Sequence, residues 1–203
     1  MLYSASDDPI RWHRFFSYKE VSVKYILTFL LLLSVSLNAS ADDGAMKQFN
    51  IGVGSYASVI AYDNTVYDDD RFSGLSVSFG YAATDQFALR AIYFTLDHDD
   101  FSDFESKGLD LLAYLGTGLA THGFKAYVGG GIFSDKWQIG PYSETFNGLQ
   151  LSGGIGYNWD SLALDFILGI RDASEYEDFI NRGLPVNVSA AAVSGTLLLS
   201  YRF

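Results

Sequence analysis

The sequence has no cysteine, only three prolines and few cations: 13 Lys and Arg stand against 24 Asp and Glu, a formal charge of −11. Without cysteine the chain can be neither a disulfide-stabilised scaffold nor a thiolate metal site. Its acidity argues against nucleic-acid binding, which needs a cationic surface to displace counterions. Apolar residues, by contrast, make up 49% of the 203 positions, aromatic residues make up 16%, and 20 residues are glycine. This composition excludes a disordered chain and favours a sheet protein of one or two domains.

A targeting segment precedes the part expected to fold. Residues 24–41 read KYILTFLLLLSVSLNASA, with Lys24 at the start, a 13-residue uncharged apolar run and an Ala-Ser-Ala cleavage signal. This is the three-part pattern of a secretory signal peptide, whose apolar run is too short to span about 30 Å of hydrocarbon. We therefore expect a signal peptide at 21–41 and a mature chain at 42–203. Residues 1–20 have mixed charges that are unusual before a signal peptide, so we expect translation to start near Val21 or Val23.

Hydrophobicity in the mature chain alternates with a period of two. In residues 75–81, LSVSFGY, Leu75, Val77 and Phe79 share one face, and serine and glycine share the other. The segments 149–157, 162–170 and 193–203 alternate in the same way. Such alternation is the signature of β-strands. Eight strands are expected, at roughly 48–60, 73–83, 86–96, 107–119, 124–134, 146–158, 162–172 and 189–203.

The predicted connections alternate between short and long. Three are tight, at 84–85, 120–123 and 159–161, and four are long, at 61–72, 97–106, 135–145 and 173–188. The short turns and both ends of the mature chain then lie at one end of the sheet, and the long, acid-rich loops lie at the other. An even number of antiparallel strands with this asymmetry is typical of outer-membrane proteins. We therefore predict an all-β fold, an eight-stranded antiparallel up-and-down transmembrane β-barrel preceded by a cleavable signal peptide.

The face opposite the expected lipid-facing side is rich in glycine and carries charge. An eight-stranded barrel is only just wide enough for side chains to fill it, and the glycines leave room for Tyr56, Tyr114 and Tyr127 on the same face. The interior charges are Arg90, Asp110, Lys125, Asp165 and Arg171, with Asp110 and Arg171 nearer the long-loop end. Because a buried charge must be paired, we expect a hydrogen-bonded, plugged lumen. The alternative is that these charges line a narrow transport path.

The C-terminal segment LLLSYRF places Leu197, Leu199, Tyr201 and Phe203 at alternate positions, with phenylalanine last. This pattern resembles the signal by which the barrel-assembly machinery recognises outer-membrane proteins. With the signal peptide and eight strands, residues 42–203 resemble the small barrel family that includes OmpX, Ail, the opacity proteins and the membrane domain of OmpA. The resemblance implies insertion in a Gram-negative outer membrane, with periplasmic termini and contact with lipid and lipopolysaccharide. Members of the family serve as adhesins, envelope stabilisers, narrow pores or lipid-modifying enzymes.

The mature chain offers few residues for catalysis or metal binding. Lipid A modification needs a nucleophile and a base within hydrogen-bond reach, and the histidines of the mature chain are His122 in a tight turn and His98 in a long loop. We interpret His98 as a solvated loop residue. The acidic segment 97–105 has oxygen ligands that suit a divalent cation, but it lacks the EF-hand spacing. We interpret it as solvated acid, or as acid loosely associated with the cations that bridge lipopolysaccharide.

These observations predict a monomeric, non-enzymatic outer-membrane protein with a structural or surface-interaction role and no cofactor or bound metal. Two other classes stay open. One is a lipid A-modifying enzyme or narrow pore of the same fold. The other is a secreted lipocalin-like binder, in which the apolar face would turn inward and the serine- and glycine-rich face would meet water.

Overall fold

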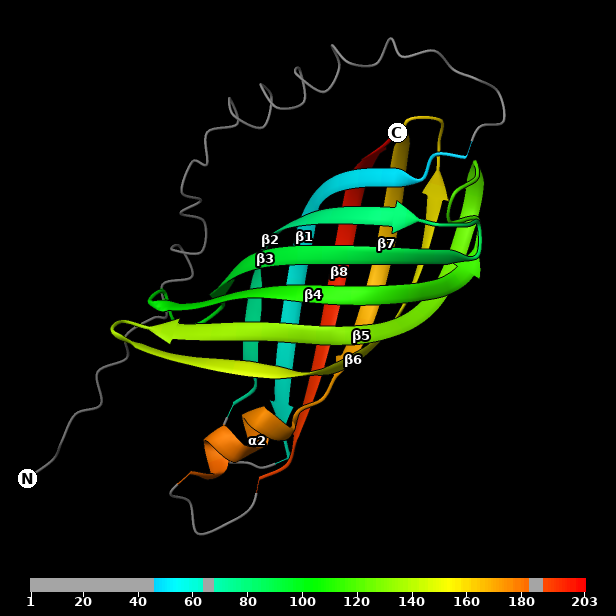
Figure 1. The fold of residues 1–203 in the computed structure, drawn as a ribbon. Coiled ribbons are helices and arrows are strands. Elements are labelled where there is room, and N and C mark those ends of the chain that lie inside the picture. Colours follow the sequence, from blue (N-terminus) through cyan, green and yellow to red (C-terminus); the bar gives the residue numbers. More distant parts are fainter. Residues whose placement is uncertain (1–45, 64–67, 183–187) are drawn as a thin grey trace, which may run out of the picture. The chain divides into compact units, whose positions relative to one another are not determined.

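A computed structural model describes residues 46–63, 68–182 and 188–203, which form a closed barrel of eight antiparallel strands. The strands are β1 (Phe49–Tyr62), β2 (Asp70–Ala82), β3 (Phe87–His98), β4 (Phe104–Thr117), β5 (Gly123–Ile139), β6 (Tyr142–Asn158), β7 (Leu162–Arg171) and β8 (Ala190–Arg202), and helix α2 (Ser174–Asn181) precedes β8 (Figure 1). The predicted eight-stranded barrel is confirmed. The expected leader and signal peptide lie outside the described residues.

Each strand pairs with its neighbours in sequence, and β1 closes the barrel against β8. That seam runs from Asn50 opposite Arg202 to Tyr62 opposite Ala190. Backbone hydrogen bonds from Phe49 N to Phe203 O (3.1 Å) and from Phe203 N to Phe49 O (2.9 Å) complete it at the chain end. Closure leaves no strand edge with unpaired backbone groups, which is the condition for placing a sheet in hydrocarbon.

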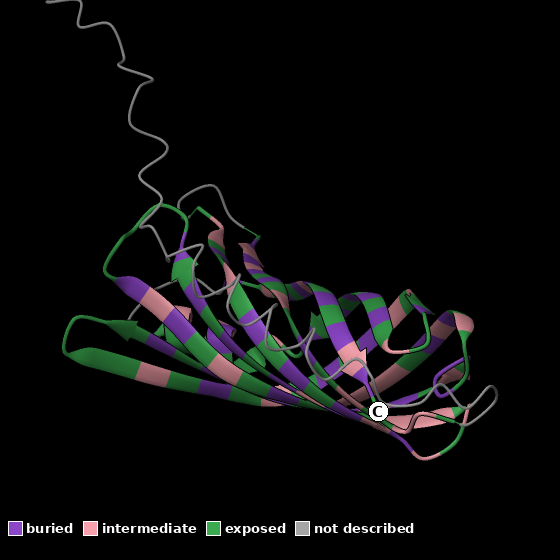
Figure 2. Cartoon of the chain, turned by 90° about the horizontal axis from the view of Figure 1, so that it is seen from above, coloured by how far each residue is buried: buried purple, intermediate pink, exposed green. Residues whose placement is uncertain are grey.

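Side chains alternate between the lumen and the exterior along every strand, as the striped colouring of Figure 2 shows. Leu75 is 67% exposed and Phe166 is 47% exposed, and Val77, Phe79 and Leu199 also face outward. An apolar surface on every strand is stable against acyl chains and unstable in water. This orientation is the reverse of a lipocalin-like binder, and it follows from the period-two pattern of the sequence.

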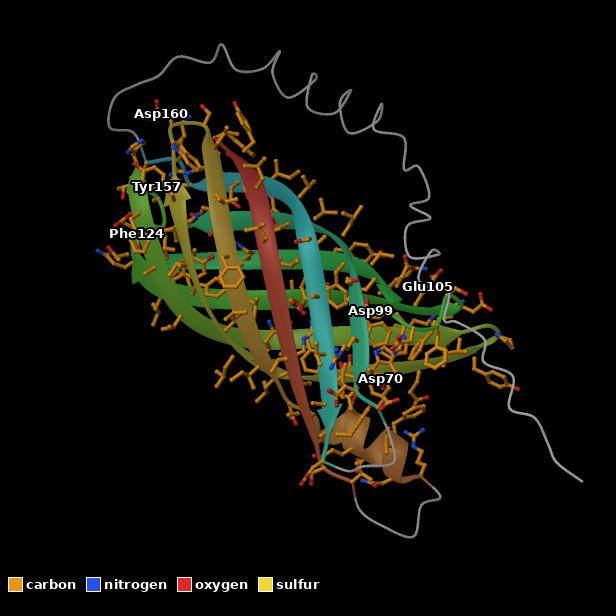
Figure 3. All side chains as sticks on the ribbon, turned by 180° about the vertical axis from the view of Figure 1, so that it is seen from behind. Asp70, Asp99, Glu105, Phe124, Tyr157 and Asp160 are labelled. Carbon is orange, nitrogen blue, oxygen red and sulfur yellow. The ribbon has the colours of Figure 1, made fainter. Side chains whose placement is uncertain are left out.

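Aromatic side chains gather on the exterior at the short-turn end. Phe49 packs near Tyr81 and Phe203, with ring centroids 5.0 and 5.9 Å away, and Tyr157 lies 5.0 Å from Trp159. Figure 3 shows Phe124 and Tyr157 at this end, beside Asp160. Rings at this level match the interfacial girdle of membrane barrels. Among the described residues, no helix is both long enough and apolar enough to span a membrane.

Two of the predicted long loops are shorter than expected. Strand β5 continues to Ile139 and β6 begins at Tyr142, so the predicted loop 135–145 is wrong: a two-residue turn joins the strands, and Gly140 supplies its positive φ of 56°. The predicted loop 97–106 likewise shrinks because β3 extends to His98 and β4 begins at Phe104. Charged residues in these segments suggested loops, although the strands continue beyond the apolar band and burial still alternates along them.

Candidate functional site

The lower half of the lumen, nearer the short turns, contains three charged residues from three strands. Asp165 of β7 accepts a hydrogen bond from Lys125 Nζ at 2.8 Å and one from the hydroxyl of Tyr127 at 2.6 Å. Arg90 Nη2 lies 3.4 Å from the same carboxylate, and Arg90 Nη1 donates to the Tyr127 hydroxyl at 3.3 Å. One carboxylate thus faces two cations, and all three side chains are buried.

Interior glycines provide the space for this group. A Cβ at Gly154 would lie 2.6 Å from ring atoms of Tyr127, and a Cβ at Gly156 would lie 2.7 Å from Cε of Lys125. Atoms this close would overlap, so the glycines of β6 let the ring of Tyr127 and the stem of Lys125 cross the lumen. The glycine-rich face recognised in the sequence is therefore a packing surface.

The upper half of the lumen is organised around Arg171 of β7. Its Nη2 donates to Asp110 Oδ1 at 2.8 Å and contacts the hydroxyl of Tyr56, and its Nε donates to Gln150 Oε1 at 2.9 Å. Tyr56 in turn donates to Asp110 Oδ2 at 2.7 Å. The guanidinium also lies over the rings of Phe94 and Phe133, 5.2 and 4.7 Å from their centroids. The side chains of Arg171 and Asp110 are fully buried.

A further carboxylate, Asp135, belongs to this cluster and was missed because the sequence suggested a loop there. Asp135 Oδ2 lies 3.6 Å from Arg171 Nη1, and Asp135 accepts hydrogen bonds from Ser106 (2.5 Å), Trp137 (3.3 Å) and Tyr176 (2.9 Å). Burial, followed by the charge of Asp135, raises the pKa of Tyr176 well above its ordinary value, so this hydroxyl stays a donor. Because Tyr176 belongs to α2, the lumen network extends into the helix at the long-loop end.

Aromatic rings pack across the long-loop end of the lumen beneath α2. Tyr176 stacks on Phe146 with centroids 4.4 Å apart, and Trp137 meets Phe72, Phe104 and Phe146 at 5.1, 5.2 and 4.9 Å. In Figure 1, α2 lies at the end of the barrel opposite the C-terminus. We call this group of six rings, which includes Phe72, Phe104, Trp137, Phe146, Tyr176 and His98, the aromatic cap.

The prediction that His98 is a solvated loop residue is wrong. Its side chain is 2% exposed, and its ring stacks on Phe104 with centroids 4.9 Å apart. Nδ1 accepts the backbone N–H of Asp100 at 3.1 Å, so the ring proton lies on Nε2, 3.2 Å from Asp70 Oδ1. Asp70 also accepts from the hydroxyl of Tyr62 at 2.6 Å. Both ring nitrogens are thus occupied, and the extension of β3 explains why the residue is buried.

At the opposite end, the β4–β5 turn folds over the lumen. Leu119 and Ala120 are buried there, whereas a turn residue is ordinarily exposed. Arg202, at the end of β8, donates to the carbonyls of Ala120 (2.5 Å) and Trp159 (2.8 Å), and Asn158 donates to the carbonyl of Gly118 at 2.7 Å. The turn is therefore held by residues from two other parts of the chain.

Asp85, in the β2–β3 turn, fixes the same β4–β5 turn from the other side. It accepts hydrogen bonds from the backbone N–H groups of Gly118 (3.1 Å) and Thr121 (3.1 Å) and from the Thr121 hydroxyl (2.8 Å). Partial burial acts to raise the pKa of Asp85, but these hydrogen bonds outweigh it and lower the pKa below its ordinary value. A carboxylate at this position therefore closes the turn while it is ionised.

The remaining candidate residues lie on exterior surfaces. Leu197, Leu199 and Phe203 point outward from the β8 end of the chain, and Tyr201 is partly buried beside Phe203. In the acidic segment 97–105, Asp99 accepts a hydrogen bond from the hydroxyl of Ser73 at 2.9 Å. Figure 3 shows Asp99, Asp70 and Glu105 at the long-loop end, opposite Asp160. Within residues 46–63, 68–182 and 188–203, no group of three His, Asp or Glu residues is arranged to hold a metal ion.

No family model and no curated protein matches the sequence. Solved structures match the fold. Ail, the attachment invasion locus protein of Yersinia pestis, is 16% identical with a TM-score of 0.51, over 78% of this chain and 100% of its own. Neisserial surface protein A is 15% identical with a TM-score of 0.52, over 76% and 97%. OprG of Pseudomonas aeruginosa is 16% identical with a TM-score of 0.50, over 79% and 98%. The chain thus has the fold of the small outer-membrane β-barrels.

Proposed function

We propose that this protein is a sealed, non-enzymatic barrel of the Gram-negative outer membrane that acts through its outer end, the end that carries the long loops and α2. The observation that carries the proposal is the filled lumen. Five charged side chains that could have lined an aqueous path are instead paired with one another across the barrel: Arg90, Asp110, Lys125, Asp165 and Arg171. An unpaired charge in such an interior would be unfavourable by several kcal/mol, about 3–5 when one partner is removed.

Both ends of the barrel support the sealed state. At the short-turn end, the β4–β5 turn lies over the lumen with Ala120 only 1% exposed. At the other end, the aromatic cap and α2 cover the Arg171 cluster, with Tyr176 only 1% exposed. A permeant ion would have to displace buried side chains at both levels. A structural or surface-interaction role accounts for this arrangement better than transport does.

The chemistry at the outer end favours a role without catalysis. A lipid A-modifying site would need a base beside a nucleophile, and His98 is the histidine placed where such a site could be built. Its Nδ1 is bonded to the backbone of Asp100, and its Nε2 faces Asp70. The hydroxyl of Tyr62, which lies beside this pair, already donates to Asp70. The three side chains support the strand ends and leave no ring nitrogen to accept a substrate proton.

Conductance recordings test the sealed lumen. We expect the purified protein in planar bilayers at neutral pH to give no steady channel, with an open porin reconstituted in the same way as the positive control. A large, steady conductance would contradict the proposal and favour the narrow-pore alternative. Substitution of His98 by alanine, followed by mass analysis of lipid A, tests the enzymatic alternative: loss of an acyl-chain modification would overturn the non-enzymatic role.

The proposed orientation places the short turns and the chain ends in the periplasm. The absence of cysteine from the whole sequence makes a clean labelling test possible. We expect Asp178→Cys, on α2, to react with a membrane-impermeant maleimide in intact cells, and Asp160→Cys, in the β6–β7 turn, to react only after the outer membrane is permeabilised. The reverse pattern would contradict the orientation. We further propose that the barrel is a monomer among lipid and lipopolysaccharide, inserted by the barrel-assembly machinery.

A further inference from the structure

A cleft opens at the outer end between α2 and the β5–β6 hairpin. Its volume is ≈ 450 Å³, within the range of small-molecule sites. Its lining includes Asp70, Phe104, Trp137, Tyr142, Glu144 and Phe179. These residues come from β2, β4, β5, β6 and α2, so the cleft exists because the hairpin extends past the apolar band and the helix lies beside it.

The floor and rim of the cleft differ in exposure. Phe104 and Trp137, in the aromatic cap, form a buried floor with ring centroids 5.2 Å apart. Ile139, Tyr142 and Phe179 form an exposed rim, and Tyr142 is 79% exposed. Phe179 meets the Trp137 ring edge to face at 6.4 Å. A flat or branched apolar group would therefore meet ring faces below and apolar side chains around it.

Two carboxylates, Asp70 and Glu144, line the cleft, and Arg182 at its edge pairs with Glu144. Both oxygens of Asp70 are engaged, by Tyr62 and by His98, so this carboxylate is held in place at the wall. Glu144 lies on the hairpin side, with its side chain 34% exposed, and accepts Arg182 Nη1 at 2.8 Å. The surrounding outer end adds the carboxylates of Asp68, Asp69, Glu177 and Asp178 and one cation, Arg71, which lies 3.5 Å from Asp69. A partner of positive charge is therefore favoured, and an anionic one is repelled.

An arginine of the chain itself, Arg182, already lies beside an aromatic ring and a carboxylate at the edge of the cleft. The guanidinium of Arg182 lies 5.6 Å from the ring centroid of Phe179 while it pairs with Glu144, and its side chain is 63% exposed. Arg182 lies at the edge and does not line the cleft. It shows that the ring of Phe179 and the carboxylate of Glu144 stand at a distance that one cationic group can reach together. Cations over aromatic rings next to a carboxylate are a recurrent recognition arrangement.

We propose that this cleft binds an organic cation with an apolar body, the body against Trp137, Ile139 and Phe179 and the charge beside Glu144. The inference deepens the proposed surface-interaction role, and it rests on that role only for the statement that the cleft faces outward. A neutral apolar ligand would desolvate the carboxylates without compensation. A compact inorganic cation would leave the aromatic walls unused.

Benzyltrimethylammonium serves as the probe, because it joins one ring to one quaternary cation. The sequence has three tryptophans, and Trp12 precedes the expected mature chain 42–203. In the mature protein, Trp159→Phe therefore leaves Trp137 as the reporter at the cleft floor. In this background we expect saturable quenching of Trp137 fluorescence by the probe. Glu144→Gln should weaken binding about fivefold, the upper range for a partly exposed ion pair. Asp178→Asn removes the same charge from α2 away from the cleft lining and should change binding less than twofold, or about 0.4 kcal/mol.

Arg182→Gln gives a prediction of opposite sign. It removes the internal cation that competes for Glu144, so binding of the probe should strengthen about threefold. Neopentylbenzene, the neutral isostere of the probe, should bind more weakly than the cation. Equal responses of Glu144→Gln and Asp178→Asn, equal binding of the isostere, or absence of saturable quenching would each overturn the inference. None of these results bears on conductance or on cysteine labelling, so the inference and the proposed function fail separately.

Discussion

Asp165 provides a quantitative test of the paired lumen. Asparagine at this position keeps the size and the ability to accept from Tyr127, but removes the charge that faces Lys125 and Arg90. Those two cations have side-chain exposures of 4% and 8%, so water cannot replace the lost partner. Removal of one member of a buried ion pair is destabilising by about 3–5 kcal/mol. Because one carboxylate here serves two cations, we expect Asp165→Asn to lower the free energy of unfolding by an amount near the top of that range.

Urea unfolding in lipid vesicles, followed by tryptophan fluorescence, measures this loss. The matched control is Asp160→Asn in the β6–β7 turn, where the carboxylate is 80% exposed and the loss should stay within about 0.5 kcal/mol. Adding Lys125→Met to the Asp165→Asn variant removes one of the two buried cations that lost their carboxylate, and should restore part of the stability. If Asp165→Asn unfolds at the same urea concentration as the control, the charge of Asp165 does not stabilise the buried cations Lys125 and Arg90, and the reasoning is refuted.

Three further outcomes are expected. Gly154→Ala should lower the free energy of unfolding by about 1–3 kcal/mol, because its Cβ would overlap the Tyr127 ring. The control is Gly153→Ala on the outward face, where no atom would lie nearer than 3.4 Å to the new Cβ. Equal losses of stability in the two variants would contradict the packing role. Asp85→Asn should be less stable than wild type at neutral pH. Since folding lowers the pKa of Asp85, the difference in stability between the two proteins should vanish as pH falls through the folded pKa. A difference that stays constant with pH would contradict the role of the ionised carboxylate. Deletion of Phe203 should slow insertion by the assembly machinery more than it lowers urea stability, and normal insertion would refute that role.

Alternation alone was sufficient to predict the barrel wall. In β2, Leu75, Val77 and Phe79 face outward and Ser76 and Ser78 face inward, because a strand sends successive side chains to opposite sides. The same parity puts the five charged lumen residues inside, since each occupies an inward position of its strand. Which cation meets which carboxylate depends on the stagger between strands, and that stagger cannot be read from one strand at a time.

The long-loop end was less predictable for a physical reason. Beyond the apolar band, the outward face of a strand meets water, so apolar and charged residues no longer separate by face. Asp135 and His98 therefore resembled loop residues, although β5 and β3 continue through them. Helix α2 is only eight residues long, and its Tyr176 is fixed by contacts with distant strands. No local propensity signal of that length predicts such a docking.

Strand β8 takes part in two closures of the barrel at once. Its pairing with β1 completes the wall, and the guanidinium of Arg202 at its end donates to the Ala120 carbonyl of the β4–β5 turn. Lateral closure of the wall and attachment of this turn therefore depend on the same strand. A change that separates β8 from β1 should also release the turn, so the two closures are coupled.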